Sequence, residues 1–138
     1  MRKCTVMITE DDAEDADFMR QALHSNAFAG NIEHFMNGAQ LMNKLSQCKA
    51  ENALPEMIIL DLNMPLKSGI EVLKEMNTDP DLQKIPVAVV TASLRKEDEE
   101  ACDTLGCELY LRKPVRFNEY EKIGSQIVSK LRSKFAYC

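Results

Sequence analysis

An aspartate that directly follows an apolar run is the first candidate for chemistry in this sequence. Residues 57–60 are all apolar, and Asp61 follows them, with Asn63, Pro65 and Gly69 within the next eight positions. An unbroken apolar run is typical of a strand buried on both faces, and ligand sites of open α/β sheets collect at the carboxyl ends of the strands. Asp61 is therefore a candidate nucleophile or metal ligand, although an Asp that only caps a loop gives the same local pattern.

Polar residues also stand at the ends of other strand-like runs. Three acids, residues 10–12, follow the first run, Thr91 ends the fourth, and Lys113 follows the fifth. Because the carboxyl ends of parallel strands meet along one edge, we expect carboxylates, a hydroxyl and an ammonium to converge there. Taken alone, Thr91 is an ordinary strand residue and Lys113 an ordinary solvated lysine. Their shared position at strand ends is what favours a site.

The charges of this site predict a divalent cation. Glu10, Asp11 and Asp61 carry three negative charges, and two unit charges about 4 Å apart repel by roughly 4 kcal/mol at an effective dielectric constant of 20. Lys113 offsets one charge, and the remainder calls for a cation or a carboxyl group with a raised pKa. A few oxygen ligands suit Mg²⁺ (or Mn²⁺), which also takes phosphate oxygens. With hydroxyl and ammonium donors beside it, Asp61 can form an aspartyl-phosphate.

The rest of the chain predicts the elements that position these groups. Apolar runs alternate strictly with amphipathic segments of helical period. The expected strands are 3–9, 32–36, 57–61, 85–91 and 107–111, and the expected helices are 14–25, 38–50, 69–77, 94–105 and 117–135, the fourth capped by Ser93. This alternation predicts an α/β fold, a doubly wound five-stranded parallel sheet with five helices on its two faces.

Composition limits the class of protein. The 138 residues are expected to form one domain, 1–138, with no output domain. A net charge of −5 argues against nucleic-acid binding. No apolar run approaches the ~20 residues of a membrane span, and no signal peptide precedes the first strand. The expected location is the cytoplasm, without a membrane partner.

The cysteines give no metal or disulfide pattern. Five are present, at positions 4, 48, 102, 107 and 138, and no two form a C-x-x-C pair. An odd number in a cytoplasmic chain predicts free thiols.

Together these motifs resemble the receiver domain of two-component response regulators. The acid pair after the first strand, Asp61 with Asn63 and Pro65, Gly69, Thr91 with Ala92, and Lys113 with Pro114 match that family in order and spacing over the whole chain. The resemblance implies a flavodoxin-like fold with strand order 2-1-3-4-5. It also implies that a sensor histidine kinase transfers a phosphoryl group from a phosphohistidine to the strand-three aspartate.

The resemblance assigns a role to each matching position. It makes Asp61 the phosphoacceptor, and Thr91 and Lys113 the phosphate-binding residues. Glu10 and Asp11 become the acid pair, with Asp11 the more direct Mg²⁺ ligand, and Asn63 becomes a metal ligand through its backbone carbonyl. Tyr110 becomes an aromatic switch, and Pro114 becomes the residue after a cis peptide bond. A second register, with Asp11 and Asp12 as the acid pair, stays open. Tyr110 could also be a strand aromatic without a role.

The function implied is that of a single-domain signalling switch. Phosphorylation would change a surface formed by the fourth helix, fifth strand and fifth helix, and the partners would be a histidine kinase and a downstream target or phosphotransfer protein. The chain would be a monomer or weak homodimer. It would catalyse only its own phosphorylation and dephosphorylation. It is similar to stand-alone receivers paired with bacteriophytochrome kinases. Two alternatives remain. One is a scaffold independent of phosphorylation, and the other is a phosphohydrolase like the haloacid dehalogenases, which usually carry an aspartate where this sequence has Asn63.

Overall fold

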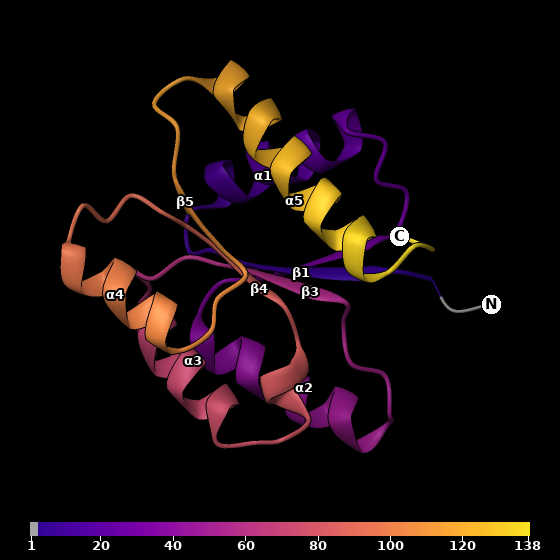
Figure 1. Cartoon of the computed structure of the whole chain (residues 1–138), viewed down its shortest axis with the longest axis vertical. Coiled ribbons are helices and arrows are strands. Elements are labelled where there is room, and N and C mark those ends of the chain that lie inside the picture. The colour runs from indigo at the N-terminus through magenta and orange to yellow at the C-terminus, as the bar shows by residue number, and fades with distance from the viewer. Residues whose placement is uncertain (1–2) are drawn as a thin grey trace.

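A central parallel sheet lies between two layers of helices (Figure 1). The computed structural model describes residues 3–138. Its strands are β1 (Thr5–Thr9), β2 (Asn31–Phe35), β3 (Met57–Leu60), β4 (Val87–Thr91) and β5 (Leu109–Arg112). Its helices are α1 (Ala13–Ser25), α2 (Gly38–Ala50), α3 (Gly69–Asn77), α4 (Lys96–Thr104) and α5 (Tyr120–Lys134), with 3-10 turns η1 (Leu82–Lys84) and η2 (Phe117–Glu119).

The strand order is β2-β1-β3-β4-β5, and every neighbouring pair is parallel. This confirms the predicted fold class and strand order. The strands of a parallel sheet all end at the same edge, so the segments that follow β1, β3, β4 and β5 are neighbours in space.

Successive residues of each central strand point to opposite faces of the sheet, which builds two separate cores. Val6, Ile59 and Val90 pack under α1 and α5 in one core. Met7, Ile58 and other alternate residues pack under α2, α3 and α4 in the other. Every residue of β3 is buried, as the apolar run predicted. Burial of one such aliphatic side chain contributes about 1.5–3 kcal/mol.

The helix starts depend on short polar side chains. Ser68 caps α3 in a capping box with Glu71, and Asn37 caps α2. The prediction that Ser93 caps the fourth helix is wrong. Here α4 begins at Lys96, and the Ser93 hydroxyl instead accepts the Arg95 N–H (3.2 Å) in the preceding loop. The predicted helix 117–135 is divided between η2 and α5.

The expectation that all five cysteines are free thiols is wrong for the two nearest the ends. Cys4 and Cys138 form a disulfide across a sequence separation of 134, with their Cα atoms 5.3 Å apart. The N- and C-terminal segments lie side by side in Figure 1, which explains how so distant a pair meets. The other three cysteines, 48, 102 and 107, remain thiols.

The segment after α5 is held against the start of β1 by more than the disulfide. The Tyr137 hydroxyl donates to Glu56 Oε2 (2.6 Å), and Glu56 Oε1 accepts the Thr5 N–H (2.8 Å). Glu56 is buried, so these bonds satisfy a carboxyl group that would otherwise be costly to bury.

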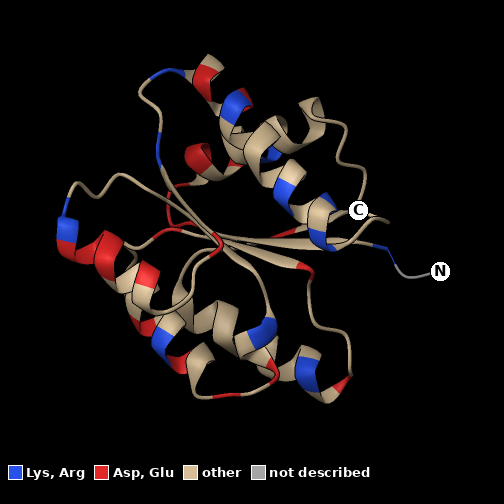
Figure 2. Ribbon diagram, viewed as in Figure 1, with Lys and Arg blue, Asp and Glu red and all other residues tan. Residues whose placement is uncertain are grey.

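Charged residues divide unevenly over the surface. Figure 2 shows acidic residues at the middle of the carboxyl edge and along α4, and basic residues at several positions of α5. Within residues 3–138, no helix combines the length and apolarity needed to cross a bilayer.

Gly69 is required by close packing behind Asp61. A Cβ at this position would overlap the Asp61 carbonyl oxygen and lie 2.7 Å from Leu62 Cα, both of them backbone atoms. We expect Gly69→Ala to lower the free energy of unfolding by about 2–3 kcal/mol, since the backbone must move. Gly106→Ala is the control, because a Cβ there meets no atom within 4 Å, and its φ of +81° alone costs about 1 kcal/mol. Urea unfolding of both variants measures the difference, and equal losses would contradict the packing argument.

Candidate functional site

The sheet brings the predicted strand-end residues to one place. Asp61 follows β3, and its N–H donates to the Thr9 carbonyl (3.1 Å) at the end of β1. Glu10 comes directly after Thr9. On the other side, the Lys113 N–H donates to the Thr91 carbonyl (2.9 Å), which fixes the end of β5 to the end of β4. These backbone bonds, rather than flexible loops, determine where the side chains lie.

The ammonium of Lys113 is the centre of the site. Lys113 Nζ lies 2.6 Å from Glu10 Oε1, 3.0 Å from Asp61 Oδ2 and 3.0 Å from Asp15 Oδ2. The Lys113 side chain is 14% exposed and that of Asp61 5%, so water screens these charges poorly. Three carboxylates share one ammonium, which leaves the cluster with excess negative charge.

Burial and the neighbouring charges both change the pKa of Glu10. Burial and the negative charge of Asp61 raise the pKa of Glu10 to about 7, although its hydrogen bond from Lys113 lowers it. Burial by itself lowers the pKa of Lys113, but the hydrogen bond to Glu10 and the charge of Asp61 outweigh burial and raise it above its ordinary value. Lys113 therefore stays charged, and the site favours either a proton on a carboxylate or an additional cation.

Three carboxylates are arranged to hold that cation. Glu10, Asp11 and Asp61 each offer an oxygen, and these oxygens all lie within 4.8 Å of one another. Asp12, the alternative acid, serves a different purpose. Its Oδ1 accepts the N–H groups of Glu14 (2.9 Å) and Asp15 (3.1 Å), so Asp12 caps α1.

The remaining predicted residues, Thr91, Asn63 and Tyr110, differ in burial and in position. Thr91 is fully buried, and its Oγ1 accepts the Ser93 N–H (3.2 Å). The exposed Asn63 donates its N–H to Asp61 Oδ1 (3.3 Å). Tyr110 lies further away, on β5, and faces a cavity beside α4.

The expectation of a cis bond before Pro114 is wrong, because residues 3–138 contain no cis peptide bond. The trans form is the intrinsically favoured one by about 0.5–1 kcal/mol. Pro114 begins a loop rather than a tight turn, and this loop leads to η2.

Two residues of the site were missed by sequence reasoning. Asp15 accepts from Lys113 and also from the Tyr120 hydroxyl (3.3 Å), and His34 Nε2 lies 2.7 Å from the Glu10 carbonyl oxygen. Asp15 stands three residues after the helix cap, in the first turn of α1. That spacing is a usable signal, since the first turn of a helix that follows β1 lies at the carboxyl edge of the sheet.

Comparison with known proteins gives the same family in sequence and in structure. A family model described as the response regulator receiver domain matches residues 6–123. The response regulator Rcp1 of Synechocystis sp. is 32% identical over 126 residues, which cover 90% of this chain and 86% of Rcp1.

Two solved structures share the fold over nearly the whole chain. The phosphorylated cyanobacterial phytochrome response regulator RcpA superimposes with a TM-score of 0.87 at 28% identity, covering 96% of each chain. The Mn²⁺-bound form of Rcp1 superimposes with a TM-score of 0.82 at 32% identity, covering 93% of each chain.

Proposed function

Since the chain belongs to the response regulator receiver domain family, we propose that it is a signalling switch whose phosphoacceptor is Asp61. Receiver domains are phosphorylated by histidine kinases and act on downstream partners. The observation that carries the proposal is the cluster around Lys113, where Asp61, Glu10 and Asp15 all lie within 3.0 Å of one ammonium. The Lys113 ammonium, beside the Asp61 carboxylate at the end of β3, is suited to binding a phosphoryl group, and the carboxylate is suited to accepting it.

In the proposed reaction an Asp61 carboxylate oxygen attacks phosphorus while the phosphorus–nitrogen bond of a phosphohistidine breaks. The phosphoryl group becomes an aspartyl-phosphate, and the imidazole leaves with the electron pair of the broken bond. Lys113 neutralises charge on the phosphoryl oxygens, and the buried Thr91 hydroxyl donates a hydrogen bond to one of them. The protein contributes position and charge and needs no general base.

Glu10, Asp11 and Asp61, with the Asn63 carbonyl, are the proposed ligands of Mg²⁺ or Mn²⁺. The fit rests on their three oxygens within 4.8 Å and on the raised pKa of Glu10, which burial and the negative charge of Asp61 produce together. A bound divalent cation neutralises the carboxylates and the incoming phosphoryl oxygens together. The Mn²⁺ that Rcp1 binds supports the same choice for this chain.

Neutralising single acids separates the two possible acid pairs. We expect Asp11→Asn to weaken Mn²⁺ binding by about 10–100-fold, because it removes one ligand charge. Asp12→Asn should leave the affinity within about twofold, since Asn caps a helix as well as Asp does. Calorimetric titration of both variants with Mn²⁺ measures the two affinities. Loss of binding in Asp12→Asn as well as in Asp11→Asn would mean that the acid pair is Asp11 and Asp12.

Exposed apolar side chains near Asp61 support docking of a partner protein. Leu66, Leu94, Val115 and Phe117 are 83%, 73%, 99% and 53% exposed, and they lie in the segments after β3, β4 and β5. Apolar residues gathered at one edge of a sheet are typical of an interaction surface. We propose that the phosphohistidine-bearing domain of a histidine kinase, of the phytochrome type by analogy with RcpA, covers this edge in the cytoplasm.

The state of Asp61 is proposed to reach a second surface through Thr91 and Tyr110. Thr91 ends β4, and Val89 lies two residues before Thr91 on the same strand. Tyr110 lies on β5 directly opposite Val89. A downstream target would then read the face formed by α4, β5 and α5.

The test is intact-mass spectrometry of the protein after incubation with acetyl phosphate. With Mg²⁺ present we expect one labile adduct of about 80 Da, the mass of one phosphoryl group. Removing the metal with EDTA should abolish the adduct, because the carboxylate cluster then repels the donor. An adduct of equal yield in EDTA would refute the metal requirement, and steady release of phosphate from a general phosphomonoester would point to a hydrolase instead.

A further inference from the structure

The end of α4 carries two cysteines at positions that a helix cap brings into contact. Gly106, at φ +81°, ends the helix, and the Gly106 N–H donates to the Asp103 carbonyl (3.2 Å). The Cys107 N–H donates to the Cys102 carbonyl (3.0 Å). These two bonds define a Schellman motif, in which the side chains at the positions of Cys102 and Cys107 usually make an apolar contact. In this chain that contact joins two thiols.

The geometry of the cap is compatible with a covalent bond between them. A 3.0 Å bond from the N–H of Cys107 to the carbonyl of Cys102 limits their Cα atoms to a separation of about 7 Å or less. Disulfides span Cα separations of roughly 4.4–6.8 Å. The Cys107 side chain also packs against the same hydrophobic cluster that contains Cys102. Only side-chain rotation and a small adjustment of the six-residue segment would be needed.

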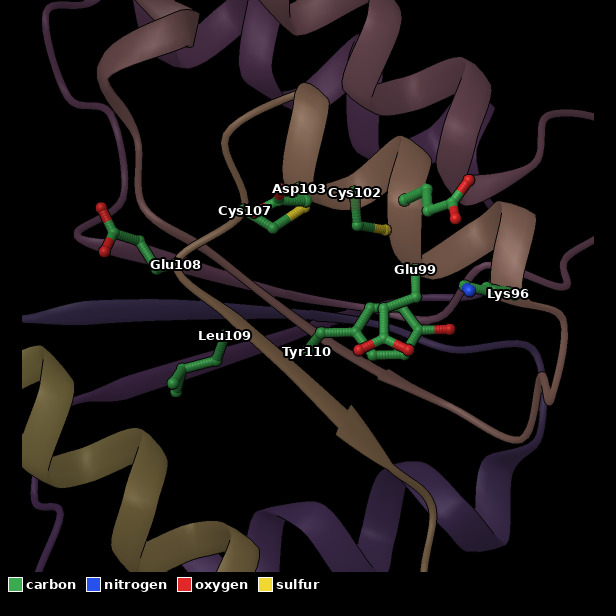
Figure 3. A pocket seen from close by; sticks show the side chains of 9 residues that line it. Lys96, Glu99, Cys102, Asp103, Cys107, Glu108, Leu109 and Tyr110 are labelled. Carbon is green, nitrogen blue, oxygen red and sulfur yellow. The ribbon is translucent and has the colours of Figure 1, made fainter.

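Both cysteines line a cavity beside α4, with Cys107 half-buried and Cys102 fully buried. Figure 3 shows Cys102 on α4 and Cys107 on the loop before β5, lining the same hollow as Tyr110. The cavity has a volume of about 480 Å³. The Tyr110 hydroxyl is buried, and no described residue forms a hydrogen bond of good geometry with it. A change in the thiol pair would therefore occur directly beside Tyr110.

We propose that Cys102 and Cys107 are a modification site, at which hydrogen peroxide converts the two thiols to a second, reversible disulfide. The Cys107 sulfur attacks one peroxide oxygen, the oxygen–oxygen bond breaks, and a sulfenic acid and water form, the water taking up the thiol proton. The Cys102 sulfur then attacks the Cys107 sulfur, the sulfur–oxygen bond breaks, and the Cys102 proton leaves with the hydroxide as a second water. Two thiols are oxidised by two electrons, and one peroxide is reduced to two waters.

The order of attack follows from the exposure of the two thiols. Cys107 is half-buried and Cys102 is fully buried, so a peroxide in the cavity reaches Cys107 first. Cys102 is then the resolving thiol.

The bond would tie the end of α4 to the start of β5. This consequence rests on the proposed function, because the face of α4, β5 and α5 is the surface that a target is proposed to read. The disulfide closes the cap and restrains the movement of α4 that a turning Tyr110 would require. Oxidation would thus act on the output of the switch without acting on Asp61.

The test is peptide mass spectrometry on the full-length protein treated with hydrogen peroxide. Trypsin cleavage after Lys96 and Arg112 releases residues 97–112, which contain both cysteines and no others. We expect this peptide to become about 2 Da lighter, to take up no alkylating reagent, and to recover both thiols with dithiothreitol. Hydrogen exchange of the last turn of α4 should slow at least about tenfold in the oxidised protein.

Four variants make the result decisive. Cys102→Ser and Cys107→Ser should each abolish the mass loss, whereas Cys48→Ser, which changes the third free thiol, should retain it. Asp61→Asn should also retain it, so failure of the phosphoacceptor proposal leaves this test intact. A peptide that keeps two alkylatable thiols, or gains oxygen on one cysteine, overturns the modification site. A mass loss without slower exchange overturns the restraint on α4.

Discussion

Asp61→Asn should abolish the phosphoryl adduct completely while leaving the protein folded. The substitution keeps the size of the side chain and its acceptor oxygen for the Asn63 N–H, but removes the nucleophilic carboxylate. The variant also loses one of the charges that face Lys113. We expect no ~80 Da adduct from acetyl phosphate at any Mg²⁺ concentration, measured by intact-mass spectrometry.

Asp12→Asn is the matched control for this experiment. Asp12 lies one residue from the proposed metal ligands, but it caps α1 and does not contact Lys113. In Asp12→Asn the phosphoryl adduct should form in the same yield as in the unmodified protein. An adduct that persisted in Asp61→Asn would place the phosphate on another side chain and refute the assignment.

Cys138→Ser should cause the largest loss of stability among conservative substitutions. The Cys4–Cys138 disulfide spans 134 residues, so it restricts the unfolded chain over nearly its whole length. A cross-link of this span contributes between about 2 and 5 kcal/mol to the free energy of unfolding. We expect the melting temperature of Cys138→Ser to fall by roughly 10 °C or more.

Dithiothreitol provides the control for that prediction. The reductant should lower the unfolding midpoint of the unmodified protein to that of Cys138→Ser and leave the variant unchanged. Cys107→Ser, which alters a free thiol, should keep the disulfide and the higher midpoint. Identical midpoints for all proteins, with and without reductant, would show that the bond does not contribute to stability.

Local patterns in the sequence were sufficient for the order and approximate bounds of the strands and helices. The predicted helices 38–50 and 69–77 coincide with α2 and α3, because the apolar residues of both segments recur with helical period. The strand order came from the receiver resemblance, and both the order and the family are confirmed. The roles given to Asp61, Thr91, Lys113 and the other site residues stay predictions.

The errors share a physical origin, since each depends on contacts remote in the sequence. Periodicity cannot reveal that the chain ends return to one another, so the disulfide was missed. Asp15 enters the site from α1 because β5 brings Lys113 to it across 98 residues. The trans bond at Pro114 and the late start of α4 depend on loop paths, which a strand-and-helix pattern does not specify.

The closeness of Cys4 and Cys138 also gives the molecule the topology of a ring. The disulfide lies where β1 begins, at the edge of the sheet where the strands start, whereas Asp61 follows the end of β3 at the opposite edge. A peptide linker there could replace the sulfur–sulfur bond. New chain ends could then be opened in the exposed loop 51–53 between α2 and β3, which lies at the same edge of the sheet. Such a circular permutant would keep every strand neighbour and the whole acidic edge, and a fused reporter would emerge on the side away from a docked kinase.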